Sequence, residues 1–184
     1  MGADSEPSGR PPSDSTGSSV LFIGGRSGVG KTTVALALHH LLAEGGVRHA
    51  LIEGDALDLA YPAPWEHGLA ERNLAGMWSN YRELGYRRLI YTNTVSVLES
   101  ASLAGAMGDA PAVVGVLLEA DTATADARLA QRESGRRLEE HRDSSADAAR
   151  RLAELAPPDV HRVQTSARLP EDIAGQILAL LGWE

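Results

Sequence analysis

A short segment near the start of the chain has the residue types and the spacing that bind a triphosphate. Gly25-Arg26-Ser27-Gly28-Val29-Gly30-Lys31-Thr32 follows the pattern Gly-x4-Gly-Lys-Ser/Thr. In this pattern the glycines let backbone N–H groups turn inward around a β-phosphate, and the helix that follows directs its positive end at the same place. Lys31 would reach the β- and γ-phosphates, and Thr32 would offer its hydroxyl to Mg²⁺.

We therefore expect ATP and Mg²⁺ as cofactors, bound at this loop and at the start of the next helix. The residues expected to contact them are Gly25, Ser27, Gly28, Val29, Gly30, Lys31, Thr32 and Thr33. The loop follows an apolar run and opens a helical pattern, as a phosphate-binding loop requires. The alternative interpretation, a Gly-rich turn that binds nothing, leaves Lys31 unexplained.

The elements that must position this loop alternate along the chain like βα units around a parallel sheet. Helical patterns alternate with short apolar runs, and five strands interleaved with helices predict an α/β fold with a doubly wound sheet. The predicted strands are 20–23, 50–52, 88–92, 113–118 and 161–164. The predicted helices are 34–43, 69–84, 122–132, the polar stretch up to 155, and 170–181.

Composition and charge limit the classes of protein to which the chain can belong. A length of 184 residues with 43% apolar residues suits one domain, placed at 19–184 after a disordered leader at 1–18 that is rich in Gly, Pro, Ser and Asp. The net charge of -8 argues against a nucleic-acid partner. No apolar run approaches the ~20 residues that span a membrane. The absence of cysteine excludes disulfides and fits a cytoplasmic protein.

Two carboxylates follow the second predicted strand. Glu53 and Asp55 come directly after 50–52, at the sheet edge where α/β proteins bind their ligands. A kinase needs a carboxylate there to orient an acceptor hydroxyl and to take its proton. Asp55 is the candidate, with Asp58 second, and Glu53 is interpreted as structural. The alternative role of Asp55 is to cap the next helix.

The segment GGRSGVGKTTVALALHHLLAEGGVRHALIEGDALD resembles the opening of adenylylsulfate kinases and of the wider group of small P-loop kinases. The resemblance implies a P-loop NTPase fold, a three-layer sandwich with a five-stranded parallel sheet in the order 2-3-1-4-5. It also assigns the acceptor-side aspartate to Asp55, and it implies that Arg72 and Asn73 bind substrate. Without the resemblance, Arg72 would be interpreted as a surface residue.

The third predicted strand ends in Thr92-Asn93-Thr94 and offers Mg²⁺ only neutral oxygens, where many P-loop proteins place an acid. Small P-loop kinases often lack this acid, and in them the aspartate of the second strand shares the water shell of the metal. The resemblance therefore implies that Asp55 and Thr32 together form the metal site.

Arginines gather after the fourth predicted strand, and Arg128 and Arg132 are spaced to share one helix face. They would neutralise a transferring phosphoryl group and close over it, or, alternatively, pair with nearby acids on a surface helix. The segment resembles the helical lid of nucleotide and gluconate-type kinases, at about 126–150. This implies that Arg128 lies against adenine and Arg132 near the phosphates. Family resemblance also implies Ser166 in the wall of the adenine pocket.

These features predict an ATP-dependent kinase that transfers the γ-phosphate to a hydroxyl or phosphate of a small metabolite, nucleotide or antibiotic. Lys31, Asp55 and Arg132 would be its catalytic residues. The alternative is a regulatory ATPase without an acceptor. A GTP switch is disfavoured because the chain has no Asn-Lys-x-Asp sequence of the kind that reads guanine.

The acceptor site is expected at 56–68, with Trp65 and Trp78 beside it. His141 and His161 are interpreted as surface or structural residues. The sequence names no acceptor chemistry and leaves the oligomeric state open, a homodimer included.

Overall fold

A five-stranded parallel sheet forms the centre of the computed structural model, which describes residues 17–131 and 134–183. The strands are β1 (Ser19–Gly24), β2 (Ala50–Glu53), β3 (Arg88–Thr92), β4 (Ala112–Glu119) and β5 (His161–Gln164). They pair in the order β2-β3-β1-β4-β5, and every pair is parallel. The predicted strand order and fold class are confirmed.

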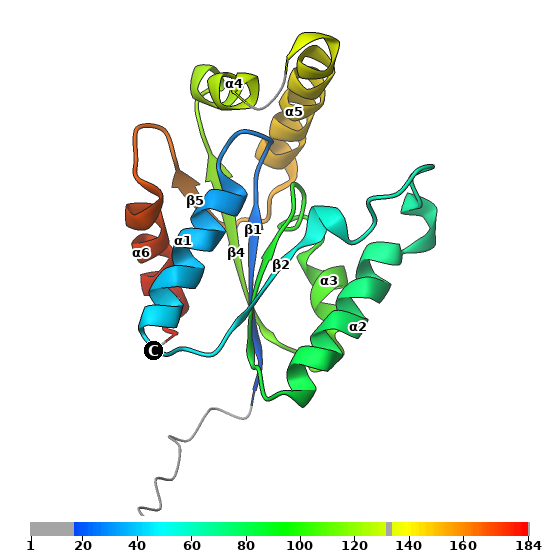
Figure 1. The fold of residues 1–184 in the computed structure, drawn as a ribbon, viewed down its shortest axis with the longest axis vertical. Coiled ribbons are helices and arrows are strands. Elements are labelled where there is room, and N and C mark those ends of the chain that lie inside the picture. The colour runs from blue at the N-terminus through cyan, green and yellow to red at the C-terminus, as the bar shows by residue number, and fades with distance from the viewer. Residues whose placement is uncertain (1–16, 132–133, 184) are drawn as a thin grey trace, which may run out of the picture.

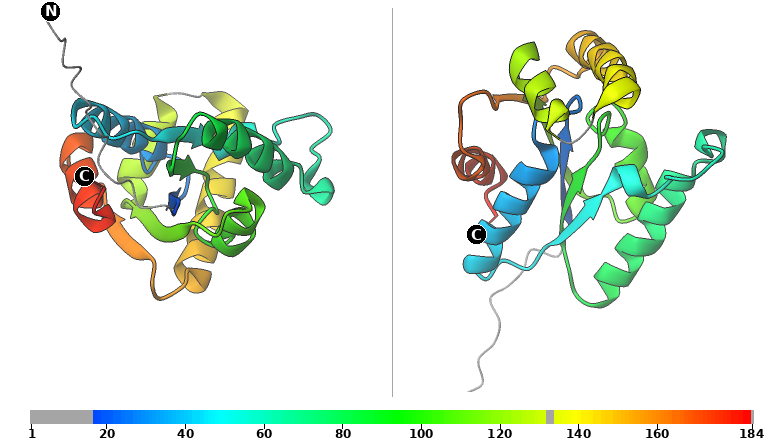
Figure 2. Two further views of the ribbon diagram at one scale, coloured as in Figure 1. Left: turned by 90° about the horizontal axis from the view of Figure 1, so that it is seen from below. Right: turned by 45° about the horizontal axis from the view of Figure 1, so that its top comes forward.

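Helices cover both faces of the sheet, so the domain has three layers (Figure 1). The helices are α1 (Lys31–Glu44), α2 (Leu69–Glu83), α3 (Ser100–Met107), α4 (Thr122–Ala130), α5 (Gly135–Leu155) and α6 (Pro170–Leu181). Short 3₁₀ turns lie at Gly54–Ala56 and Trp65–His67. Helices α1 and α6 pack on one face and α2 and α3 on the other, while α4 and α5 lie over the end of the sheet (Figure 2).

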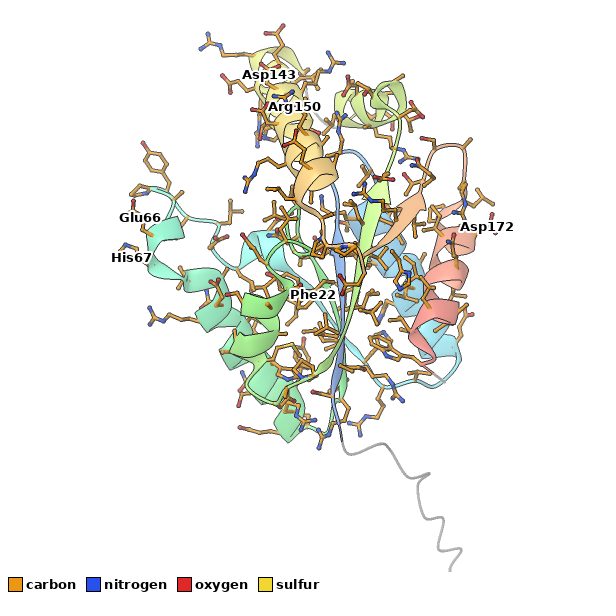
Figure 3. The ribbon with its side chains drawn as sticks, turned by 180° about the vertical axis from the view of Figure 1, so that it is seen from behind. Phe22, Glu66, His67, Asp143, Arg150 and Asp172 are labelled. Atoms are coloured by element: carbon orange, nitrogen blue, oxygen red, sulfur yellow. The ribbon has the colours of Figure 1, made fainter. Side chains whose placement is uncertain are left out.

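Strand β1 is buried on both sides, and its alternating side chains feed two cores. Leu21 and Ile23 join the cluster that contains α1 and α6. Val20 and Phe22 join the cluster that contains α2 and α3, and Phe22 lies near the middle of the sheet in Figure 3. Because β1 is central, the loop that follows it is held at the middle of the sheet edge.

Trp78 differs from its predicted place beside the acceptor site. Its side chain is fully buried in the core between α2 and the sheet, and its Nε1 donates a hydrogen bond to Asp109 at 3.2 Å. The helix α2 presents Leu74 and Trp78, four residues apart, to the core, and this burial outweighs any role in a surface pocket.

Other differences lie in the helices. Helix α3 was not predicted from the sequence, and α4 ends at Ala130, before the predicted end at 132. Arg132 and most of the predicted leader lie outside the described residues. Across 17–131 and 134–183, no helix combines the length and apolar character that a membrane span requires.

Candidate functional site

The loop between β1 and α1 has the backbone of a phosphate cradle. Gly25, Gly28 and Gly30 have φ of 144°, 86° and 97°, a region that strains any residue with a side chain. A Cβ atom at Gly28 would also lie 2.4 Å from the carbonyl oxygen of Ala125 at α4. The loop therefore requires glycine both for its turn and for its close approach to α4.

Lys31, the first residue of α1, lies back across this loop. Its Nζ donates to the carbonyl oxygen of Gly25 at 2.8 Å, and it lies 3.5 Å from the carbonyl oxygen of Arg26 and from the Thr94 hydroxyl. Thr94 follows β3, so the end of the third strand supplies a neutral oxygen next to the Lys31 ammonium group. The ammonium group is thus held at the mouth of the loop, where phosphates would meet it.

The Thr32 hydroxyl donates to the Oε2 atom of Glu53 at 3.2 Å. The other carboxylate oxygen of Glu53, Oε1, is buried and has no hydrogen-bond partner in the described chain. Two oxygen donors, one of them an unsatisfied carboxylate oxygen, fit a hard cation such as Mg²⁺. From the sequence, Glu53 was interpreted as structural. Its contact with Thr32 depends on the fold, and no local sequence pattern predicts it.

A cavity of about 190 Å³ lies in front of the loop. Loop residues form one side of it, and Asp55 forms part of another. Its lining consists of Ser27, Gly28, Gly30, Lys31, Thr32, Asp55, Leu129 and His141. Leu129 comes from α4 and His141 from α5, so both helices contribute to its wall. We call this space the phosphate cavity.

A larger cavity of about 590 Å³ adjoins it, and Asp55 lines this one too. The predicted acceptor segment 56–68 contributes to its wall. Its lining is Asp55, Asp58, Leu59, Ala60, Ala63, Gly68, Leu69, Ala70, Glu71, Tyr91, Asn93, Thr94, Val95, Glu99, Leu103 and Arg151. We call it the acceptor cavity, because it shares Asp55 with the phosphate cavity and contains the segment predicted to bind the acceptor.

Arg72 and Asn73 do not line the acceptor cavity, although the family resemblance implied that they hold substrate. Arg72 is exposed on α2, and the Nδ2 atom of Asn73 donates to the carbonyl oxygen of Leu57 at 2.6 Å. Asn73 therefore fixes the loop that forms the cavity wall. The neighbouring Glu71, one residue earlier, does line the cavity, together with Leu69 and Ala70 at the start of α2.

Tyr91 lines the acceptor cavity together with four carboxylates. Burial raises the pKa of the Tyr91 phenol, and the negative charges of Asp55, Glu99, Asp58 and Glu71 raise it further. Partial burial also raises the pKa of Glu99, together with the charges of Glu71 and Asp58, while Arg151 opposes them. The phenol stays protonated at neutral pH and is available as a hydrogen-bond donor.

A third cavity, of about 250 Å³, lies on the other side of the loop, between α1, α4 and the start of α6. Arg128 lines it and is anchored by donating to the carbonyl oxygens of Gly28, Val29 and Thr165 and to the Thr165 hydroxyl, at 3.2 to 3.4 Å. The lining is Gly28, Val29, Gly30, Thr33, Val34, Arg128, Gln131, Thr165, Arg168, Pro170 and Ile173. Arg128, which the family resemblance assigns to the adenine, is therefore part of the wall of this cavity.

Ser166 lies beside this third cavity and is not part of its lining. Its Oγ accepts a hydrogen bond from the backbone N–H of Asp121 at 3.0 Å. Hydrogen bonds with Ser166 and Thr124 lower the pKa of Asp121 to about 2. Ser166 thus ties the loop after β5 to the start of α4, while Thr165 supplies the contact with Arg128.

Arg26, at a variable position of the loop pattern, is buried and joins the loop to the helices above it. Its Nε donates to the Ser145 hydroxyl of α5 at 2.8 Å, and its Nη2 pairs with Asp126 of α4 at 2.9 Å. The Ser145 hydroxyl donates in turn to the carbonyl oxygen of Ser27 at 3.1 Å. Sequence patterns gave no sign of this link, since Arg26 and Ser145 are 119 residues apart.

Comparisons with known proteins agree with this arrangement. The sequence profile of the CobQ/CobB/MinD/ParA nucleotide binding domain (CbiA) matches residues 20–118. No curated protein matches the sequence.

Solved structures share the fold. The tunicamycin resistance protein of Deinococcus radiodurans is 21% identical with a TM-score of 0.61, over 91% of this chain and 97% of that one. A gluconokinase from Sinorhizobium meliloti 1021 is 20% identical with a TM-score of 0.58, over 90% and 91%. The adenylylsulfate (APS) kinase CysC of Mycobacterium tuberculosis, solved with AMPPNP and APS, is 20% identical with a TM-score of 0.54, over 90% and 98%.

Proposed function

Since the chain belongs to the CobQ/CobB/MinD/ParA nucleotide-binding family, we propose that it is an ATP-dependent phosphotransferase acting on a small molecule. It transfers the γ-phosphate of ATP to a hydroxyl or phosphate of an acceptor that occupies the acceptor cavity. The kinases among its structural neighbours support the proposal.

The observation that carries the proposal is the position of Asp55. Its side chain belongs to the wall of both the phosphate cavity and the acceptor cavity. A carboxylate between donor and acceptor is what phosphoryl transfer to a hydroxyl requires. Asp55 takes the hydroxyl proton as the acceptor oxygen bonds to phosphorus, the bond between the β–γ bridging oxygen and the γ-phosphorus breaks, and ADP leaves.

The residues of the loop hold the donor. Lys31 and the backbone N–H groups of the loop bind the β- and γ-phosphates, and Thr32 and Glu53 hold Mg²⁺. When bound, Mg²⁺ supplies positive charge that offsets the charge of the phosphate oxygens. From the sequence, Asp55 was predicted to bind the metal. In this proposal Glu53 binds the metal, and Asp55 acts mainly on the acceptor.

Arg128 and the helices α4 and α5 close the donor side. Arg128 lies against the base in the third cavity and holds the loop after β5, while the role of Arg132, which lies outside the described residues, stays a prediction. The lid formed by α4 and α5 is coupled to phosphate binding because Arg26 ties both helices to the loop. Closure would exclude water that otherwise hydrolyses ATP.

The test is ADP release by the purified chain with Mg²⁺ and ATP, measured with and without each member of a panel of hydroxylated small molecules. The proposal expects ADP release that rises several-fold with at least one acceptor and a phosphorylated product detected by mass spectrometry. Steady ADP release that no acceptor changes, with inorganic phosphate as the sole product, would instead identify a regulatory ATPase.

A further inference from the structure

The acceptor cavity carries more negative charge than an acceptor with carboxylate or phosphate groups would tolerate. Four carboxylates and one guanidinium line it, a formal charge of −3 from Asp55, Asp58, Glu71, Glu99 and Arg151. In the described part of the chain, none of these four acids forms a salt bridge. The negative charge is therefore left for a ligand to neutralise.

These carboxylates converge and do not lie scattered over a surface. All four act on the same buried phenol, Tyr91, and Glu71 and Asp58 both act on Glu99. Glu71 comes from α2, and its Oε1 accepts a hydrogen bond from Ser102 of α3 at 3.3 Å. The two helices therefore hold the acids toward one space from two directions.

A second observation points to a ligand with hydroxyl groups. Tyr91 is 1% exposed and lines the cavity, and its hydroxyl makes no hydrogen bond to any residue that the structure describes. The hydroxyl oxygen is not itself buried, so it opens into the cavity and can donate to a ligand oxygen there. Asp55 lines the same cavity, so the phenol is a donor to an acceptor oxygen near the site of transfer.

A metal cluster does not account for the acids. Among residues 17–131 and 134–183, no three histidine, aspartate or glutamate side chains are arranged to hold a metal ion. The remaining wall contains Asn93 and Thr94 and an apolar part formed by Leu59, Leu69, Val95 and Leu103. A cavity of about 590 Å³ has the size of sites that enclose a drug-sized ligand.

We propose that the acceptor is an organic cation with hydroxyl groups, of the class of amino sugars and aminocyclitols, and this inference rests on the proposed phosphotransferase function. Glu71 and Glu99 bind its ammonium group. Tyr91 and Asp55 bind the hydroxyl that is phosphorylated, and the leucines contact its carbon skeleton. An acceptor with a carboxylate or a phosphate is repelled by the same acids.

The experiment compares matched ligands that differ only in charge. Binding of kanamycin A and of its tetra-N-acetyl derivative is measured by isothermal titration calorimetry with Mg²⁺ and a non-hydrolysable ATP analogue present. Glucosamine, N-acetylglucosamine and gluconate form a smaller set. We expect each amine to bind at least about tenfold more tightly than its acetylated counterpart, because acetylation removes the positive charge. We expect no binding of gluconate.

A variant pair locates the binding. The double variant Glu71→Gln/Glu99→Gln should weaken amine binding about tenfold or more. Glu66→Gln removes one charge from the projecting loop, outside the cavity lining (Figure 3), and should leave binding unchanged. Thermal denaturation verifies that both variants fold. If the double variant does not fold, the comparison of amine with acetylated ligand still tests whether binding requires a positive charge, since it uses the unaltered chain.

The outcomes separate the two proposals. Binding of the amines that depends on Glu71 and Glu99, without phosphoryl transfer, keeps the ligand class and overturns the phosphotransferase. Transfer to N-acetylglucosamine or gluconate that equals or exceeds transfer to the amines keeps the phosphotransferase and overturns the ligand class. Amines that neither bind nor react also overturn the ligand class.

Discussion

The Thr32 hydroxyl and the Glu53 carboxylate meet at 3.2 Å, at the place where α1 begins and β2 ends. The contact joins the last residue of the phosphate-loop pattern to the end of β2, two residues before Asp55. Because the remaining oxygen of Glu53 is buried and unsatisfied, the pair is suited to a cation bound next to the phosphates.

Glu53→Gln should raise the Mg²⁺ concentration needed for half-maximal turnover by about tenfold, since partners of a metal ligand typically contribute that much to affinity. Binding of ATP in EDTA should change little. The measurement is a Mg²⁺ titration of ADP release. Glu44→Gln, at the exposed far end of α1, is the matched control. An unchanged Mg²⁺ requirement in Glu53→Gln would return Glu53 to a structural role.

Ser145→Ala should destabilise the fold by about 1–3 kcal/mol, because the buried Nε of Arg26 loses its hydrogen-bond acceptor and the carbonyl oxygen of Ser27 loses its donor. Urea denaturation measures the change in the free energy of unfolding. Ser144→Ala, one residue earlier on the exposed side of α5, should change it little. Equal effects at the two serines would contradict the link between the loop and α5.

The sequence predicted those parts of the structure whose causes are local. Strands β3 and β5 and helix α6 have the predicted bounds because apolar runs and helical spacing are written in consecutive residues. Helix α3 was missed because its sequence, SASLAGAM, is mostly small residues and buries only Leu103 and Met107. Its formation depends on packing against α2 and the sheet, which no local pattern records.

The same distinction between local and long-range causes applies to the residues of the site. The loop from Gly25 to Thr32 was predicted because one segment holds the entire pattern. The contacts of Glu53 with Thr32 and of Arg26 with Ser145 bring together residues that are 21 and 119 positions apart. Only the fold brings such pairs together. Arg72 was assigned to the substrate by resemblance, while the helical turn of α2 places the neighbouring Glu71 in the lining of the acceptor cavity.

Gly54→Ala should destabilise the fold by about 1–3 kcal/mol or more, and it should weaken acceptor binding. A Cβ atom there would lie 2.3 Å from the ring and hydroxyl of Tyr91, which is packed in the core and cannot move freely. Gly76→Ala, on the exposed side of α2 where a Cβ meets nothing within 4 Å, should stabilise by about 0.5–1 kcal/mol. Denaturation curves of both variants measure the difference.

The stability of the fold should fall as the pH decreases below about 6.5. Burial lowers the pKa of His49 from this ordinary value. Between the two values the unfolded chain binds a proton that the folded chain does not, so the free energy of unfolding decreases with falling pH. The ring of His49 also shares a hydrogen bond of 2.8 Å with His39.

Thermal denaturation from pH 5 to 8 tests this dependence. His49→Asn should flatten the acidic limb of the curve, while His161→Gln, at an exposed residue of β5, should leave its shape unchanged. If the wild-type chain and His49→Asn lose stability in parallel on acidification, the buried imidazole is not the cause.

Asp55→Asn tests the central claim most directly, since Asp55 borders both the phosphate cavity and the acceptor cavity. With an acceptor identified, kcat should fall by about 100-fold or more, because an amide cannot take the hydroxyl proton, while the Kd for ATP should stay within about twofold. Asp159→Asn, exposed before β5, is the control. A loss of ATP binding with kcat retained at saturating ATP would contradict the account.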